Sequence, residues 1–171
     1  MEIIKLIGIL IIIIIPTYIG VIYAKSFEYR VKDLQEIRNA LNIFKAKIKY
    51  TYKPVPEVFL EISKEVKDNI ADVFKDASEL MKNKIASEAW ENALKDNEKN
   101  LNITKEDINV LFNLGKMLGN TDLEGQISII DLTCNMLEKQ IEDAMEVKNK
   151  NSKLYKTLGA GIGLTIAIIL I

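Results

Sequence analysis

Residues 6–24 read LIGILIIIIIPTYIGVIYA, a stretch of 19 residues without a single charge. An α-helix of this length measures about 28 Å at ~1.5 Å per residue, which matches the hydrocarbon core of a bilayer. Pro16 lies inside the stretch, but a lipid-buried helix tolerates proline as a kink. We therefore predict an N-terminal transmembrane anchor over residues 1–24, on which the rest of the fold is built.

A cleaved signal peptide is the alternative for this segment. Lys5 followed by an apolar run supplies the charged and apolar regions of such a peptide. The cleavage site is poor, because Ala24 is the only suitable small residue and Ile22 breaks the small-x-small pattern before it. We predict that the segment is retained as an anchor.

The other end of the chain is apolar as well, over residues 157–171. When the segment is extended back to Leu154 it comprises 18 residues, which form a helix of about 27 Å. A helix of this length can span the membrane if the Lys156 side chain extends toward the headgroups. Gly159 and Gly163 have the G-x-x-x-G spacing that lets another helix approach closely, and the first span is one possible partner. Glycine is also common in membrane helices without such a role. We predict a second transmembrane helix here.

Basic residues next to the two apolar segments predict the orientation. Four of them follow the first segment and five precede the second, whereas only Lys5 and the amino terminus flank the outer side. The positive-inside rule therefore places residues 25–156 in the cytoplasm.

The central region has helical periodicity throughout and no alternating strand pattern. Apolar residues recur every seven positions from Phe27 to Ile48, and a second seam alternates steps of four and three from Leu123 to Ala144, with Cys134 on it. Pro54 and Pro56 end the first long helix, and shorter helices fill the middle, one of them capped by Ser87. The predicted fold is all-α: a membrane-anchored helical bundle whose long first and last helices pack antiparallel, with a coiled-coil-like seam, between two transmembrane helices.

Composition excludes much chemistry. The chain has no histidine, one cysteine, and 23 Lys+Arg against 24 Asp+Glu. The usual general base near neutral pH, the nitrogen ligand of zinc sites and cysteine-rich metal sites are therefore missing. No phosphate-binding G-x-x-x-x-G-K-[ST] loop occurs, and the near-neutral charge gives no general attraction to nucleic acid. We expect no enzymatic activity, cofactor, metal, nucleic-acid partner or small-molecule substrate.

One local motif is more specific than this background. Residues 114–126 read LGKMLGNTDLEGQ, with two glycines four apart near a helix end and an aspartate in the next first turn. Such a pattern permits close helix contact and then a sharp turn. Thr104 with Asp107 and Thr121 with Glu124 are capping-box pairs on either side. The candidate residues for a partner contact or a hinge, with a purely structural hairpin as the alternative, are Leu114, Gly115, Leu118, Gly119, Asp122 and Gln126.

This motif resembles the stage III sporulation protein AB family of endospore-forming bacteria. The resemblance also includes the N-terminal apolar segment, Tyr50 with Pro54 and Glu57, and the tail KNSKLYKTLG at residues 150–159. The sequence departs from the family at Lys53-Pro54-Val55, where a Thr-Pro-Leu run is expected.

The resemblance implies a membrane component of the channel-like complex that joins mother cell and forespore, similar to the inner-membrane platform protein of type II secretion and type IV pilus systems. The implied partners are the cytoplasmic secretion ATPase of the same complex, its other membrane proteins and the lipid bilayer. The implied location is the mother-cell membrane around the forespore.

Two other functions stay open from the sequence. One is a two-span sensor with an extracytoplasmic ligand-binding bundle, although the flanking charges and the lack of residues after Ile171 argue against it. The other is a secreted helical protein held by its tail, which requires cleavage near Ala24.

Overall fold

The computed structural model describes residues 2–51 and 53–170, and within them the side chains of all residues except 2–7, 9, 68 and 170. Every regular element in these ranges is helical, so the all-helical prediction is confirmed for them. The ends of the predicted apolar segments at Met1 and Ile171, and the side chain of Lys5, lie outside this description. The helices are α1 Glu2–Thr51, α2 Val55–Glu65, α3 Asp68–Leu80, α4 Ala86–Asn97, η1 Glu98–Asn100, α5 Lys105–Met117 and α6 Leu123–Leu170.

Two long helices, α1 and α6, begin and end the described chain. α1 is continuous over 50 residues, including Pro16, and α6 over 48 residues. Thr17 Oγ1 donates a hydrogen bond to the Ile13 carbonyl one turn earlier, at 2.8 Å. α1 ends before Pro54, whose preceding residue is disfavoured in helical geometry.

The chain divides into two compact units, to both of which α1 and α6 contribute. The two-helix unit consists of Met1–Val31 and Asp143–Ile171, and the bundle unit of Lys32–Glu142. This division reflects packing within the chain, so the predicted membrane boundaries at residues 24 and 157 stay predictions.

In the two-helix unit, glycines allow the backbones of α1 and α6 to meet. A Cβ on Gly159 would lie 2.7 Å from the Pro16 carbonyl oxygen, and one on Gly163 would lie 2.9 Å from that of Ile13. A Cβ on Gly20 of α1 would lie 2.5 Å from the Tyr155 carbonyl oxygen. Any larger residue at these positions must push the helices apart.

One helix in the described part of the chain is long and apolar enough to cross a membrane, judged by length and composition. It lies near the N-terminus, over Leu10–Thr51, and its most apolar window is only 11% buried. Within the described residues, no window of α6 meets the same criterion. A second membrane span therefore stays a prediction.

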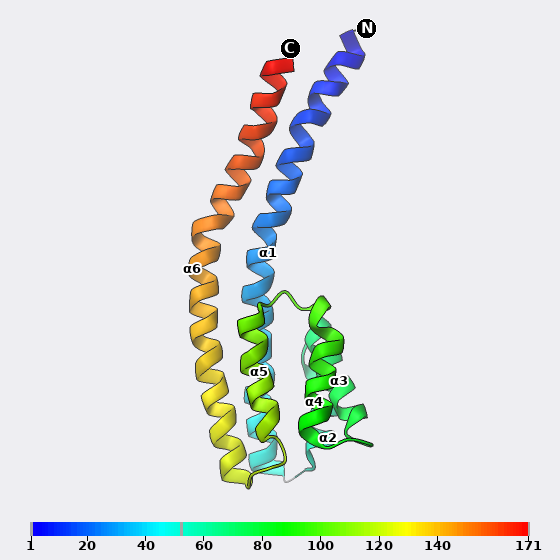
Figure 1. Cartoon of the computed structure of the whole chain (residues 1–171), viewed down its shortest axis with the longest axis vertical. Helices are drawn as coiled ribbons and strands as arrows, with labels where there is room; N and C mark the ends of the chain where they lie inside the picture. Colours follow the sequence, from blue (N-terminus) through cyan, green and yellow to red (C-terminus); the bar gives the residue numbers. More distant parts are fainter. Residues whose placement is uncertain (1, 52, 171) are drawn as a thin grey trace. The chain divides into compact units, whose positions relative to one another are not determined.

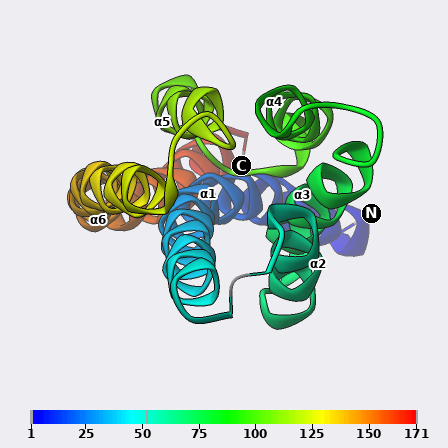
Figure 2. The same ribbon diagram turned by 90° about the horizontal axis from the view of Figure 1, so that it is seen from below.

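The bundle unit is built around the last part of α1. In Figure 2, α5 and α6 lie on one side of α1, whereas α2, α3 and α4 lie on its other side. The seam predicted on α1 is buried from Leu34 to Ile48, whereas Phe27, its first predicted member, is only partly buried. Along α6 the seam is buried from Ile130 to Ala144, but Leu123, predicted as its first member, is 38% exposed because it stands at the end of the bundle.

Four aromatic side chains form the centre of this core. The ring centroids of Phe44 and Phe59 are 5.0 Å apart, those of Phe59 and Phe74 are 5.1 Å apart, and Trp90 lies 5.3–5.5 Å from Phe59 and Phe74. The rings meet edge to face, the arrangement that aromatic quadrupoles favour. The cluster joins α1, α2, α3 and α4, each of which supplies one ring.

Helix capping agrees with the sequence at one site and differs at two. Thr104 and Asp107 form a capping box at the start of α5. The predicted cap at Ser87 is wrong, because α4 begins at Ala86 and its N-cap is Ile85, which has no side-chain bond. The box predicted for Thr121 and Glu124 is also wrong, as the next subsection describes.

Candidate functional site

The hairpin motif, residues 114–126, begins where α5 packs against Trp90. A Cβ on Gly115 would lie only 2.4 Å from Trp90 Cδ1, so glycine is required for the indole to lie where it does. Trp90 Nε1 donates a hydrogen bond to the Leu111 carbonyl at 2.8 Å. The same side chain thus packs on α5 and bonds to it, which locks α4 and α5 together.

The turn after α5 depends on Leu118 and Gly119. Leu114 and Leu118 are each 1% exposed and hold the end of the helix on the core. Gly119 has φ of 76°, a left-handed conformation that glycine adopts without steric cost. The predicted sharp turn therefore exists, and Gly119 adopts the left-handed conformation that it requires.

Asp122 caps the start of α6. Its Oδ1 accepts a hydrogen bond from the Gly125 backbone N–H at 2.9 Å, whereas the Thr121 hydroxyl is buried without a hydrogen-bond partner. Gln126 Nε2 donates to the Thr121 carbonyl at 3.2 Å and closes the turn from the other side. Asp122 directly precedes α6, so Gly125 stands at position N3, whose backbone N–H the N-cap side chain accepts.

Each of the six candidate residues of the hairpin motif therefore has a local structural task. These residues determine the shape of the α5–α6 turn, and other side chains of the motif remain accessible. Met117 and Leu123 are each 38% exposed, and Asn120 is exposed between them. A partner would meet these residues first.

The end of α1 lies beside this turn. Figures 1 and 2 both show the end of α1 and the start of α6 at one end of the bundle unit. Lys45 near the end of α1 pairs with Asp131 near the start of α6, with Nζ and Oδ1 2.6 Å apart. We give the name end surface to six of the exposed residues at this end: Tyr50, Pro54, Glu57, Met117, Asn120 and Leu123.

Tyr50 is the most accessible large side chain of the end surface, at 72% exposure. The Lys49 ammonium lies 5.4 Å from the centroid of its ring. A large aromatic ring exposed to solvent is typical of protein interfaces, where tyrosine is enriched.

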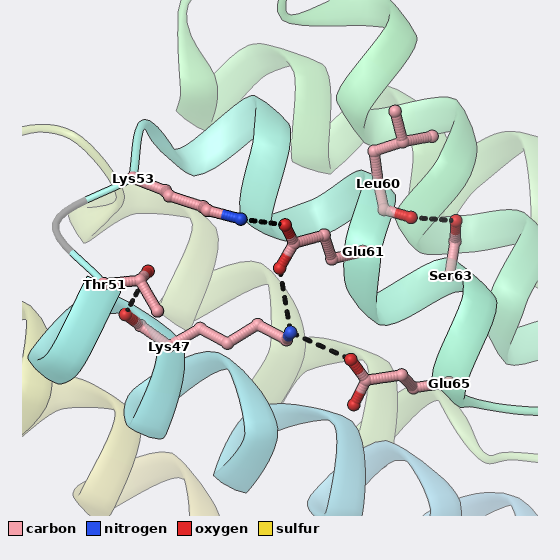
Figure 3. Close-up of polar contacts among 7 residues, drawn as sticks. All are labelled: Lys47, Thr51, Lys53, Leu60, Glu61, Ser63 and Glu65. Carbon is pink, nitrogen blue, oxygen red and sulfur yellow. Dashed lines mark hydrogen bonds and ion pairs between the residues drawn. The ribbon is translucent and has the colours of Figure 1, made fainter.

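An ion-pair cluster fixes the corner where α1 passes into α2 (Figure 3). Lys47 Nζ lies 2.8 Å from Glu61 Oε2 and 2.8 Å from Glu65 Oε1, so one lysine bridges two turns of α2. Lys53 also pairs with Glu61. We call Lys47, Lys53, Glu61 and Glu65 the corner clamp.

The corner clamp shifts the ionisation of its members. Hydrogen bonds from Lys47 and then Lys53 lower the pKa of Glu61 to about 2. Hydrogen bonds to Glu61 and Glu65 raise the pKa of Lys47. The lowered pKa of Glu61 and the raised pKa of Lys47 keep this pair charged at neutral pH, and the pair joins α1 to α2.

No chemistry-bearing cluster accompanies these features. Among the residues that the structure describes, no group of three or more His, Cys, Asp or Glu side chains could hold a metal ion. Cys134 is buried, as predicted, and burial raises the pKa of its thiol, which disfavours the reactive thiolate.

The structure thus brings the six predicted hairpin residues together, and places Gly159 and Gly163 in the other unit, against α1. Sequence reasoning missed Met117 and Leu123 as surface residues. Leu123 was assigned to the buried seam by its spacing, and only its place at the end of the bundle exposes it.

Comparison with known proteins agrees with these features. The family described as Stage III sporulation protein AB matches residues 5–171. Stage III sporulation protein AB of Bacillus subtilis (strain 168) is 30% identical over 168 residues, covering 97% of this chain and 98% of the relative. A solved structure of Stage III sporulation protein AB matches with a TM-score of 0.68 and 27% identity, over 71% of this chain and 98% of that one. None of these descriptions names a sensor. The chain, with its hairpin motif and helical bundle, belongs to the stage III sporulation protein AB family.

Proposed function

We propose that this protein is a non-enzymatic platform in the channel-like complex between mother cell and forespore, and that its end surface docks the cytoplasmic secretion ATPase. The observation that carries the proposal is the end surface itself. The two internal segments that link the sequence to its family, residues 50–57 and 114–126, lie at one end of the bundle and contain the exposed residues Tyr50, Met117 and Leu123.

The long helices support a role in relaying movement. α1 runs without interruption from the apolar window into the bundle core, so a displacement of the bundle acts directly on a candidate membrane helix. We propose that α1 and α6 are antiparallel and both cross the mother-cell membrane, with residues 25–156 in the cytoplasm. Contacts of Gly20 with Gly159 and of Ile13 with Gly163 support this arrangement.

The partners in this proposal are proteins and lipid. They are the ATPase, the other membrane proteins of the complex and the bilayer, without nucleic acid or a small-molecule substrate. A bundle without a nucleotide-binding loop of its own receives work only from a partner, which is the relation of a platform to its ATPase.

The test is binding of the purified ATPase to the full chain in detergent micelles. We expect Tyr50→Ala combined with Leu123→Ala to weaken binding at least tenfold, because exposed aromatic and aliphatic anchors at an interface centre contribute about 2 kcal/mol or more. Tyr29→Ala combined with Ile85→Ala is the control, since it removes another exposed tyrosine and another exposed aliphatic residue, which are 47% and 62% accessible. If the two double variants bind the ATPase equally well, the docking site does not lie on the end surface. If the unaltered chain does not bind the ATPase, the proposed docking is wrong.

A further inference from the structure

We propose that a lysine cluster on α6 in the two-helix unit binds the headgroups of anionic phospholipids. The cluster consists of Lys148, Lys150, Lys153 and Lys156. The inference rests on the membrane anchoring proposed above and adds a lipid class and a binding site to it.

The first observation is the concentration of charge. The whole chain has one more acidic than basic residue, yet residues 147–171 contain four lysines and no acidic residue. Glu146 precedes Lys150 by one turn, but no ion pair joins them. The positive charge of Lys150, Lys153 and Lys156 therefore points to solvent without an acidic partner among the described residues.

The second observation is the shape of the surface around these lysines. A shallow hollow of about 390 Å³ is lined by Asn149, Lys150, Lys153, Leu154, Thr157 and Leu158. A second, of about 360 Å³, adjoins it and is lined by Lys148, Asn149, Ser152, Lys153, Lys156 and Thr157. Lys153 belongs to both. The first hollow offers leucine side chains to an acyl chain, and the second offers ammonium and hydroxyl groups to a phosphate.

The third observation is that the lysine cluster adjoins tyrosine rings and the start of the apolar part of α6. Tyr155, between Lys153 and Lys156, stacks on Tyr23 of α1 with ring centroids 5.9 Å apart and contacts Phe27 at 5.7 Å. Tyrosine rings gather at the boundary between headgroups and acyl chains. Residues 158–169 continue as an almost wholly apolar helix, so the lysines stand where the apolar surface begins.

These observations together favour a lipid over a soluble anion. A soluble phosphate needs only the charges, whereas a phospholipid also needs an adjoining apolar surface and a position at the headgroup level. Clusters of lysine next to a membrane helix bind anionic leaflets, and each lysine near the surface contributes a factor of about five to binding.

The test is native mass spectrometry of the full chain, released from micelles that contain equal amounts of phosphatidylglycerol and phosphatidylcholine. We expect the chain to retain phosphatidylglycerol at least fivefold over phosphatidylcholine. Lys150→Gln, Lys153→Gln and Lys156→Gln together should bring this preference close to one. Lys64→Gln, Lys82→Gln and Lys105→Gln together remove the same charge from exposed sites in the bundle unit and should leave it unchanged.

Other outcomes overturn the inference. Equal retention of the two lipids, or an unchanged preference in the α6 variant, means that the lysines do not select a headgroup. Displacement of phosphatidylglycerol by an equal concentration of soluble glycerophosphate means that the site binds soluble anions. The α6 variant keeps every apolar residue and the whole end surface, so it should still sediment with membranes and bind the ATPase. Loss of either would show a failure of the proposed anchoring or docking rather than of lipid selection.

Discussion

At the scale of single residues, the contact between Gly115 and Trp90 joins two elements that are distant in the sequence. The indole occupies the space that a Cβ at position 115 would fill, and bonds to the backbone one turn earlier. The same ring packs edge to face on Phe59 and Phe74. The hairpin motif and the aromatic core are therefore one packing unit, and a disturbance at Gly115 reaches both.

Gly115→Ala should destabilise the bundle by about 1–3 kcal/mol, because an added methyl group overpacks a filled site. The chain has a single tryptophan, so Trp90 fluorescence during urea unfolding of the full chain in micelles reports this site directly. Gly161→Ala is the matched control, since a Cβ there meets nothing within 4 Å. Equal unfolding midpoints for the two variants would contradict the packing role of Gly115.

Glu61 makes the corner clamp sensitive to acid. Its folded-state pKa is about 2 and its ordinary value is 4.5, so its contribution to stability is complete above pH 4.5 and disappears as the pH falls toward 2. Glu61→Gln should therefore lower the unfolding midpoint at pH 6, and the difference from the unaltered chain should shrink between pH 4.5 and 2.

The measurement is thermal unfolding of both chains across this pH range, followed by circular dichroism. Glu88→Gln removes the same charge from an exposed position on α4 and should show no such convergence. A difference between Glu61→Gln and the unaltered chain that stays constant from pH 6 to 2 would rule out the ion pairs as its cause.

At the scale of the helices, the packing of α1 on α6 depends on glycines. Gly20, Gly159 and Gly163 each face backbone atoms of the opposite helix at distances that admit no side chain. Gly161, which lies between Gly159 and Gly163 on α6, has no atom within 4 Å of where its Cβ would lie. Spacing and environment thus separate packing glycines from those that membrane helices merely tolerate.

Gly159→Leu should separate the two helices near the Tyr23–Tyr155 stack. The test places cysteines at positions 23 and 155 in a Cys134→Ser chain and measures the yield of bridging by a short bifunctional thiol reagent. We expect a high yield with Gly159 and a loss of at least severalfold in Gly159→Leu. Gly161→Leu should retain the high yield. Similar yields in the two variants would show that Gly159 does not determine the contact.

The sequence predicted helices better than it predicted their ends and surfaces. The buried seams of α1 and α6 followed from periodicity, because a helix buries one stripe. Spacing could not choose between Thr121 and Asp122 as the cap, since both precede α6 by a suitable distance. The Gly115–Trp90 contact and the end surface join residues from separate helices, and no local pattern encodes such pairings.

At the scale of the whole molecule, the end surface and the lysine cluster belong to different units of one chain. The first offers exposed aromatic and aliphatic side chains, as a protein partner requires, and the second offers lysines beside an apolar surface, as a lipid requires. Their variants should therefore fail separately, one in binding the ATPase and the other in selecting phospholipid.

The central claim is that the bundle works in the cytoplasm, where the ATPase is found. The most direct measurement replaces Cys134 with serine, introduces Asn100→Cys at an exposed position of the bundle unit, and labels cells with a membrane-impermeant thiol reagent. We predict labelling only after the cells are permeabilised. Labelling in intact cells would place the bundle outside the cytoplasm and contradict its role as an ATPase platform.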